Sequence, residues 1–338
     1  MKAIYIEEPG QICLQEVPRP LRNPGEALIK VRSLGICGSD VSAYKGTNPT
    51  MTYPRILGHE IAGEILEIDE NDKGMKVGDR VVLEPYFSCG HCYPCSLGMI
   101  NNCETMNVLG VRMEGGMTEE ISHPVKYLHK VPAQLGWDQA AMIEPLSISL
   151  HVVHRAAIKS GETVVITGAG TIGLLAAKVC LAYGARPILI DPVDARLQLA
   201  NAQGVEHTIN PLRQQVTELI HTLTNGSMAA AVLECSGANA AIQDAAKYAA
   251  NSGRIVFVGW PKAEVSLPVP LFIRKELSIF GSRNSVREFP ESIELIASGR
   301  VDVISVISKK VSLAEIPAAI IELADHPDRY LKIVALQS

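Results

Sequence analysis

The sequence predicts an α/β protein made of two unlike parts, a β-rich first lobe and a doubly wound parallel sheet. Short alternating runs separated by Pro-Gly turns fill the first part and are typical of antiparallel strands. Near residue 145 the pattern changes to apolar strand-like runs that alternate with helical periodicity, which indicates a parallel sheet. Because 338 residues exceed what one hydrophobic core usually holds, we expect two domains.

The first part is expected to form short strands at Ala3–Ile6, Ile12–Glu16, Ala27–Val31, Ile61–Ile68 and Arg80–Leu83. In the second part we expect strands at Thr163–Thr167, Pro187–Ile190, Ala230–Glu234 and Arg254–Val258, and helices at Ile172–Tyr183 and Asp194–Gln203. After residue 285 the pattern changes again, with a helix at Phe289–Ala297 and a strand at Leu331–Ala335. Periodicity alone does not decide whether this tail rejoins the first lobe.

The composition is that of an ordinary globular protein, with 47% hydrophobic residues, 20% charged residues and a net charge of -5. No basic run is present, so neither nucleic acid nor a membrane surface is an expected partner. The most apolar segment, Val164 to Cys180, is interrupted by glycines and Lys178, which argues against a membrane span. The N-terminus becomes acidic before any signal-type apolar region forms, and the cysteine usage favours a reducing, cytoplasmic location.

Four cysteines, Cys89, Cys92, Cys95 and Cys103, follow one another with the spacing C-x2-C-x2-C-x7-C. This spacing lets one short loop surround a tetrahedral ion, and four thiolates that leave no open position describe a structural zinc site. A redox or disulfide cluster is the alternative interpretation. A closed zinc site stabilises a lobe and catalyses nothing, so reactive groups are expected elsewhere.

A glycine motif, Gly168-Ala-Gly170-Thr-Ile-Gly173, lies between the expected strand and helix of a dinucleotide-binding unit. A tight contact of small residues between a strand and a helix is the alternative. Asp191 ends the next strand, eighteen residues after Gly173, where a carboxylate suits a ribose 2′-hydroxyl and would repel a 2′-phosphate, so NAD is favoured over NADP. Arg196 borders the adenine or is a solvated helix residue. The full set of expected cofactor contacts is Gly168, Gly170, Thr171, Ile172, Gly173, Asp191, Arg196, Ser236, Val258 and Gly259.

A second group of candidate metal ligands precedes the cysteine cluster, in Gly35-Ile-Cys37-Gly-Ser39-Asp40 and Gly58-His59-Glu60. The flanking glycines suggest that both segments approach a shared point, although a core cysteine and a surface histidine would explain the pattern too. Glu144 stands in an apolar segment, Ala140-Ala-Met-Ile-Glu-Pro-Leu. A buried carboxylate needs a partner, and a cation is one such partner.

Across its whole length the chain resembles the zinc-dependent medium-chain dehydrogenases, and most closely the branch of sorbitol, threonine, butanediol and galactonate-type sugar-acid dehydrogenases. The residues that carry the resemblance are Gly35–Asp40, Tyr53–Glu60, the four-cysteine run, Glu144-Pro145 and the glycine motif. The resemblance implies a GroES-like catalytic domain at residues 1–148, a Rossmann NAD-binding domain at 149–284 and a C-terminal segment, 285–338, that returns to the first domain.

The resemblance further implies one catalytic and one structural zinc ion per chain, together with NAD. Cys37, His59 and a glutamate would hold the catalytic zinc, with Glu60 and Glu144 both contacting it during turnover; which of them is the resting ligand stays open. Ser39 matches the hydroxyl that takes the alcohol proton, and Asp40 the acid that orients the histidine. A turn serine and a capping aspartate are the alternatives.

The implied reaction is hydride transfer from a secondary alcohol of a polyol or sugar acid to NAD. A threonine 3-dehydrogenase-like or butanediol dehydrogenase-like enzyme shares the same motifs, whereas a catalytically silent cofactor-binding protein would be expected to lack a metal ligand. The expected partners are a small-molecule alcohol and further copies of the chain, as a dimer or tetramer with its interface near Leu267–Phe280.

Some positions depart from the family pattern. Ser42 occupies the place of a histidine that passes the proton outward in polyol enzymes, so the end of the relay is open. Met117 is expected to line the substrate pocket in place of an aromatic ring, with plain packing as the alternative. Arg283 could pair with a substrate carboxylate. The remaining cysteines are expected in the core, namely Cys13, Cys180 and Cys235.

Overall fold

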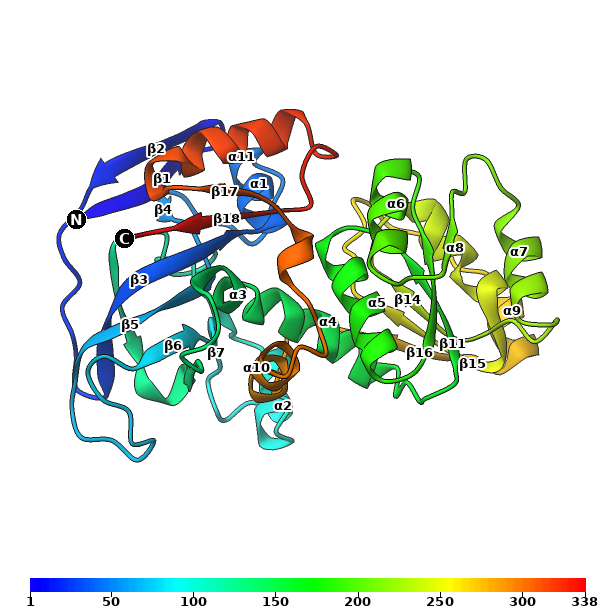
Figure 1. Cartoon of the computed structure of the whole chain (residues 1–338), viewed down its shortest axis with the longest axis horizontal. Coiled ribbons are helices and arrows are strands. Elements are labelled where there is room, and N and C mark those ends of the chain that lie inside the picture. The colour runs from blue at the N-terminus through cyan, green and yellow to red at the C-terminus, as the bar shows by residue number, and fades with distance from the viewer. The chain divides into compact units, whose positions relative to one another are not determined.

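The computed structural model describes residues 1–338 and divides into two compact units (Figure 1). The first unit contains Met1–Glu144, Phe289–Gly299 and Val303–Ser338. The second unit contains Pro145–Glu288 and Arg300–Asp302. No helix combines the length and the apolar character that crossing a membrane requires.

The first unit is built mainly of strands. Its strands are β1 (Lys2–Glu8), β2 (Gln11–Glu16), β3 (Glu26–Ile36), β4 (Arg55–Ile56), β5 (Glu60–Ile68), β6 (Arg80–Leu83), β7 (Tyr86–Phe87), β8 (Asn107–Val108), β9 (Glu120–Pro124), β10 (Leu128–Lys130), β17 (Ile307–Val311) and β18 (Lys332–Leu336). Its helices are α1 (Gly38–Tyr44), α2 (Tyr93–Ser96), α3 (Trp137–Ala141), α10 (Phe289–Ala297) and α11 (Ile316–Asp325), with short 3-10 turns at Ile100–Asn102, Val125–Tyr127, Ile304–Val306 and Leu313–Glu315.

A seven-stranded sheet organises the first unit, in the order β10-β6-β5-β3-β18-β17 with β9 also paired to β3. The C-terminal strand β18 runs antiparallel to β3, so the last residues of the chain lie beside the first lobe; Figure 1 shows this red strand next to the blue β3. Fully buried aliphatic side chains such as Ile29, Leu34 and Ile61 fill its core. Burial of such side chains is the main stabilising contribution to the lobe.

Strand β3 is longer than the sequence predicts, because it continues past Val31 to Ile36. Gly35 interrupts the alternation that marks a strand, yet its missing side chain has a use. A Cβ at Gly35 would overlap the carboxylate of Glu60, its partner on β5. The glycine therefore lets β3 and β5 pair while a charged side chain lies between them.

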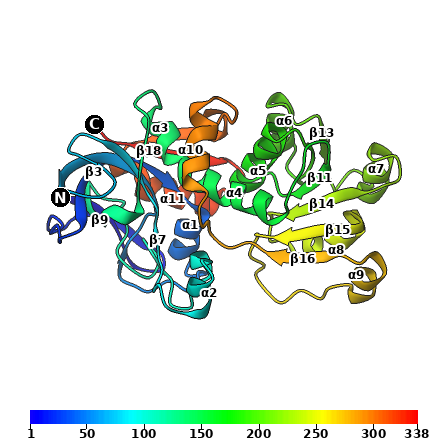
Figure 2. The same ribbon diagram turned by 90° about the horizontal axis from the view of Figure 1, so that it is seen from below.

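The second unit holds a six-stranded parallel sheet in the order β13-β12-β11-β14-β15-β16. Its strands are β11 (Thr163–Thr167), β12 (Arg186–Ile190), β13 (His207–Ile209), β14 (Ala229–Glu234), β15 (Ala249–Phe257) and β16 (Ser278–Gly281). Its helices are α5 (Thr171–Ala182), α6 (Asp194–Ala202), α7 (Val216–Leu223), α8 (Asn239–Tyr248) and α9 (Val269–Lys275), and α4 (Ile143–Arg155) bridges the division between the units. Figure 2 shows β14, β15 and β16 side by side.

This strand order confirms the predicted doubly wound sheet, in which the strands that follow β11 are added first on one side of it (β12, β13) and then on the other (β14, β15, β16), so the strand order reverses between β11 and β14. Ligands of such sheets bind at the carboxyl ends of the strands near this reversal. The expected helix at Phe289–Ala297 is α10, whereas α4, α7 and α8 were not predicted. The segment Leu267–Phe280, expected to form strands, holds helix α9 before the short strand β16, so that expectation is wrong for its first part.

Two expectations about packing need correction. Cys13 is exposed on β2, an edge strand of a three-stranded sheet, so its prediction as a core residue is wrong. Cys180 is buried and Cys235 is partly buried. Met117 has no exposed surface and packs against Gly58 in the core of the first unit, so packing rather than pocket lining describes it.

Candidate metal centres and nucleotide site

The four cysteines of the predicted structural site come together in the first unit. The sulfur atoms of Cys89, Cys92, Cys95 and Cys103 lie within 4.8 Å of one another, and none of these residues forms a disulfide. Backbone N–H groups support the sulfurs: Cys89 N donates to Cys103 Sγ at 3.2 Å and Cys92 N to Cys89 Sγ at 3.4 Å. Four converging sulfur donors fit a closed tetrahedral zinc site.

A second metal-type group forms where β3 ends and β5 begins. Ligand atoms of Cys37, His59 and Glu60 lie within 4.8 Å of one another. The pairing of Gly35 with Glu60 across the two strands brings these positions together from residues more than twenty apart in the chain. A thiol, an imidazole and a carboxylate are all ligands that zinc accepts, and three protein ligands leave a position for a reactant.

Unpaired polar atoms at this group also fit a bound ligand. His59 Nδ1 and Ser39 Oγ are buried and have no hydrogen-bond partner in the structure. An unsatisfied buried polar atom costs about 1–3 kcal/mol, so such atoms are rare unless something absent from the protein chain completes them. The residues present therefore fit a metal ion together with a bound hydroxyl compound.

Asp40 lies beside this group and is buried. Its Oδ2 accepts a hydrogen bond from the backbone N of Cys37 at 2.8 Å, which closes the first turn of α1. Burial raises the pKa of Asp40, and the nearby His59 opposes this shift. The structure thus shows Asp40 fixing the backbone of Cys37, while its expected role in orienting His59 stays a prediction.

Glu144 reaches the same region from the start of α4 and is buried. Its Oε1 accepts a hydrogen bond from the hydroxyl of Tyr86, a residue that the sequence did not single out. Burial, followed by the neighbouring charge of Glu60, raises the pKa of Glu144 to about 7. Glu144 does not belong to the group of three ligand atoms within 4.8 Å.

Lys332 is the second residue that sequence reasoning missed. It comes from β18, is buried, and donates from Nζ to Glu60 Oε2 and, at 3.0 Å, to the backbone O of Ile36. A buried charge must be paired, and here a lysine and a carboxylate satisfy each other. A single lysine opening the apolar strand Lys332-Ile-Val-Ala-Leu was the available signal.

Ser42 does not replace the missing histidine of a relay in this conformation. Its Oγ donates to the backbone O of Gly38 at 2.9 Å, one turn earlier in α1. The hydroxyl is therefore used by its own helix.

The glycine motif forms the expected turn between β11 and α5 in the second unit. Gly168 has a φ of 93°, which a side chain would strain, and a Cβ at Gly173 would overlap the backbone O of Gly168. A Cβ at Gly170, the N-cap of α5, would meet no protein atom within 4 Å. The first and third glycines are thus needed by the fold, whereas the second leaves open space at a helix N-terminus, where a phosphate can approach. Thr171 and Ile172 begin this helix.

Asp191 follows β12 and is buried next to the glycine turn. Its Oδ2 accepts from the backbone N of Ala169 at 2.7 Å, and its Oδ1 accepts from the backbone N of Val193 at 2.9 Å. Arg196 Nη1 lies 3.7 Å from Asp191 Oδ2. The carboxylate is therefore fixed at the turn, and Arg196 faces it.

The remaining predicted contacts lie after β14 and β15. Ser236 packs against Gly168, and the backbone N atoms of Val258 and Gly259 both donate to the carbonyl of Glu234 at 3.0 Å. Glu234 was not marked by the sequence, although a glutamate directly before Cys-Ser-Gly at the end of a buried strand is unusual.

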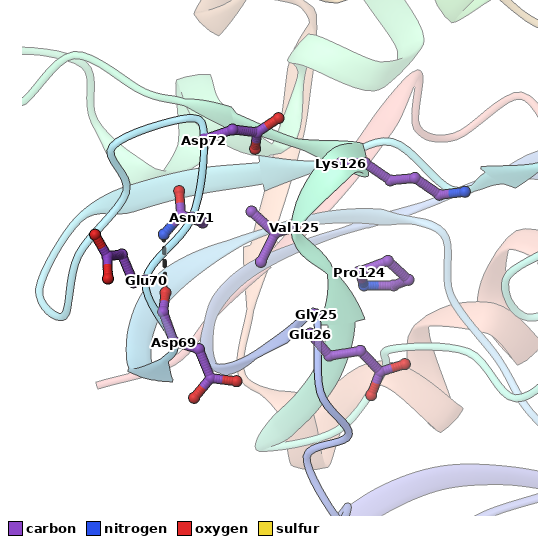
Figure 3. A pocket seen from close by; sticks show the side chains of 9 residues that line it. All are labelled: Gly25, Glu26, Asp69, Glu70, Asn71, Asp72, Pro124, Val125 and Lys126. Carbon is purple, nitrogen blue, oxygen red and sulfur yellow. Dashed lines mark hydrogen bonds between the residues drawn. The ribbon is translucent and has the colours of Figure 1, made fainter.

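A separate surface cavity of about 320 Å³ lies in the first unit, and Figure 3 shows its nine lining residues. Acidic side chains dominate it, but Asp69 is engaged by Arg22 at 2.6 and 2.8 Å, and the amide of Asn71 donates to the backbone O of Asp69 at 3.0 Å. None of the predicted site residues lines this cavity.

Comparisons with known proteins match both parts of the chain. Residues 23–133 match the family model of the alcohol dehydrogenase GroES-like domain, and residues 171–298 match the zinc-binding dehydrogenase model. The chain is 48% identical to an uncharacterised zinc-type alcohol dehydrogenase-like protein of Haemophilus influenzae, over 99% of this chain and 98% of that protein. It is 36% identical to the L-galactonate-5-dehydrogenase of Escherichia coli, over 89% of this chain and 88% of that enzyme.

Among solved structures, an Escherichia coli alcohol dehydrogenase complexed with NADH superposes with a TM-score of 0.93. That likeness covers 100% of this chain and 99% of the other at 33% identity. The family models and this structure confirm the predicted combination of a GroES-like lobe and a Rossmann domain.

Proposed function

The chain is a member of the zinc-dependent medium-chain dehydrogenases, and we propose that it oxidises a secondary alcohol of a polyol or sugar acid with NAD as the hydride acceptor. The observation that carries this proposal is the convergence of Cys37, His59 and Glu60 beside the unpaired hydroxyl of Ser39. The identity to a sugar-acid dehydrogenase supports the substrate class.

In this proposal the chain holds two zinc ions. Cys37, His59 and Glu60 would hold the catalytic ion at rest, with Glu144 as a further ligand during turnover, and the four cysteines would hold the structural ion. A zinc ion with an open position makes a bound alcohol far easier to deprotonate. Ser39, whose Oγ has no partner in the structure, would take the alcohol proton and release its own hydroxyl proton toward solvent, while Lys332 and Tyr86 hold the two glutamates in place.

NAD is the proposed cofactor because a buried, fixed carboxylate at Asp191 accepts hydroxyl donors and repels a phosphate. Gly168, Gly170, Gly173 and the start of α5 receive the pyrophosphate. Arg196 faces Asp191, and its positive charge could accommodate the 2′-phosphate of NADP. Measuring activity with NAD and with NADP distinguishes an NAD-specific site from one that accepts both cofactors.

The proposed domains are residues 1–148 for catalysis, 149–284 for the cofactor and 285–338 as a segment that returns to the first. We place the protein in the cytoplasm, because its eight cysteines form no disulfide. A homo-oligomer is proposed from the exposed apolar side chains along β16 and α9.

To test this function, purified protein is mixed with NAD and one of the candidate substrates (polyols, aldonates, threonine or butanediol), and the formation of NADH is followed by its absorbance. Turnover of polyols or aldonates, lost in a folded Cys37→Ser variant that has half the zinc content, is the expected result. Turnover of threonine alone would replace the proposed substrate class. Full activity in Cys37→Ser would remove the catalytic role of this group.

A further inference from the structure

We infer that Glu234 is a positioning residue for the dinucleotide site, because its buried carboxylate fixes the loop after β14 against the glycine turn. This inference rests on the proposed function, since it requires a dinucleotide at these strand ends. Glu234 is the last residue of β14 and has no exposed surface.

The carboxylate of Glu234 is surrounded by donors. Its Oε1 accepts from the backbone N of Ser236 at 2.9 Å and of Gly237 at 3.1 Å, and also from the hydroxyl of Ser236. Its Oε2 accepts from the backbone N of Gly237 at 3.2 Å. The hydroxyl of Thr167, at the end of β11, donates to Oε1 at 3.3 Å. Only an ionised carboxylate accepts at every one of these contacts.

These contacts join the segments that form the proposed cofactor site. The side chain of Glu234 holds Ser236, which lies against Gly168: a Cβ at Gly168 would stand 2.9 Å from the Cβ of Ser236. The backbone carbonyl of Glu234 holds Val258 and Gly259, each at 3.0 Å. One residue therefore ties three loops at the reversal of the strand order, where doubly wound sheets bind their ligands.

The negative charge, and not only the shape, is needed for this arrangement. No cation pairs with Glu234 in the structure; backbone and hydroxyl donors stabilise its charge instead. A glutamine has the same shape but turns two of its own donors toward these groups, so part of the network must open. A role in packing alone would not distinguish the two side chains.

The test compares NADH binding by the zinc-loaded wild type and Glu234→Gln, using calorimetry and the fluorescence of bound NADH. We expect the Kd for NADH and the KM for NAD to rise about tenfold, as the loss of hydrogen bonds to a charged group implies. The kcat at saturating NAD and the zinc content should stay within twofold of the wild type, because the carboxylate holds the cofactor loop and not the metal centre.

Glu162→Gln is the matched control. Glu162 directly precedes β11, at the end opposite to Thr167, and pairs with Arg254 of β15 at 2.6 Å. This variant should lower the melting temperature and leave the Kd for NADH unchanged. Thr167→Val removes a single donor to Glu234 and should raise the Kd for NADH about threefold. This variant provides the test if Glu234→Gln does not fold.

Each result is decisive. An unchanged Kd in the folded Glu234→Gln variant, or in Thr167→Val where Glu234→Gln is unfolded, overturns the inference and leaves the proposed function intact if the wild type binds NADH. Equal weakening in Glu162→Gln also overturns it, because the effect would then be general destabilisation. If the wild type binds NADPH alone, the NAD proposal fails and the same comparison is made with NADPH. If it binds neither cofactor, both proposals fail.

Discussion

At the scale of single residues, Lys332 balances the charge of the candidate catalytic centre. Cys37, Glu60 and Glu144 bring acidic groups into one buried region, and Lys332 is the cation that the chain itself supplies there. Its Nζ reaches Glu60 across 272 positions of sequence. A zinc ion bound at the proposed site and Lys332 would therefore both act on the carboxylate of Glu60.

Replacing Lys332 by methionine should destabilise the zinc-free protein by about 3 kcal/mol, because the carboxylate of Glu60 is left buried without a partner. Added zinc should recover most of that loss, since the ion supplies positive charge at the same place. Thermal unfolding with and without zinc, after exhaustive chelation, measures both effects.

Lys310→Met provides the comparison, because Lys310 pairs with Asp138 at 2.6 Å in a more exposed position. Such a surface pair contributes about 0–1 kcal/mol, so the control should be nearly neutral with and without zinc. Equal stability losses in the two variants would show that Lys332 has no special relation to the metal centre.

The three glycines of the nucleotide turn should respond differently to alanine. Gly173→Ala should lower stability by about 1–3 kcal/mol, because its Cβ overlaps the backbone O of Gly168. Gly170→Ala meets no protein atom and should change stability by no more than about 0.5 kcal/mol, while it weakens NADH binding by intruding on the ligand. Urea unfolding and NADH titration of both variants test this contrast; NADH affinity unchanged in Gly170→Ala would contradict it.

At the scale of elements, the sequence predicted a helix or strand best where the residues at both of its ends mark its boundaries. Strand β11 matches its prediction because a polar residue, Glu162, precedes it and a turn glycine, Gly168, follows it. Helix α4 was not predicted, because its start lies in an apolar segment without a polar face and contains Pro145.

The same reasoning applies to the site. Residue type and flanking glycines suggested that the segments of Cys37 and His59 approach a shared point, and the family resemblance implied Cys37, His59 and a glutamate as ligands; the structure brings Cys37, His59 and Glu60 together. Tyr86 carries no local signal, and the single lysine that opens the apolar strand β18 does not reveal its partner. The contacts of Tyr86 with Glu144 and of Lys332 with Glu60 exist only in the folded protein. Contacts between residues far apart in the chain cannot be predicted from a local sequence pattern.

Glu288 fixes helix α4 to the segment that leads into α10. Its Oε1 lies 2.9 Å from His151 Nδ1 and 3.3 Å from His154 Nδ1, and its Oε2 accepts from the backbone N of Val286 at 2.6 Å. Burial opposes ionisation of Glu288, but hydrogen bonds from these histidines and backbone groups outweigh it and lower the pKa well below the ordinary value of 4.5.

We expect Glu288→Gln to lower the free energy of unfolding by about 3 kcal/mol at pH 7. Since the pKa of Glu288 is depressed on folding, its contribution is present above the unfolded value of 4.5 and is lost as pH falls below it. The difference between wild type and variant in urea unfolding should therefore shrink between pH 5 and pH 3. A difference independent of pH would contradict this account.

At the scale of the whole molecule, the edge of the second unit's sheet is unusually apolar. Strand β16 lies at this edge, with Ile279 41% exposed; Trp260, which follows β15, and Ile273 of α9 are 79% and 75% exposed. An uncovered apolar edge strand invites pairing with another strand. Strand β16 is short and is the last strand of the parallel sheet. We propose that its partner is strand β16 of a second copy of the chain, so that the two sheets pair edge to edge.

Ile279→Lys should therefore turn the proposed oligomer into monomers, because the edge pairing would bring two lysines together in a buried contact, where they repel. Light scattering coupled to size exclusion measures the mass, expected near 36.4 kDa for the variant. Leu212→Lys is the control, since Leu212 is 79% exposed but lies after β13 at the opposite edge. A monomeric wild type would refute the proposed assembly, and an oligomeric Ile279→Lys variant would place the interface elsewhere.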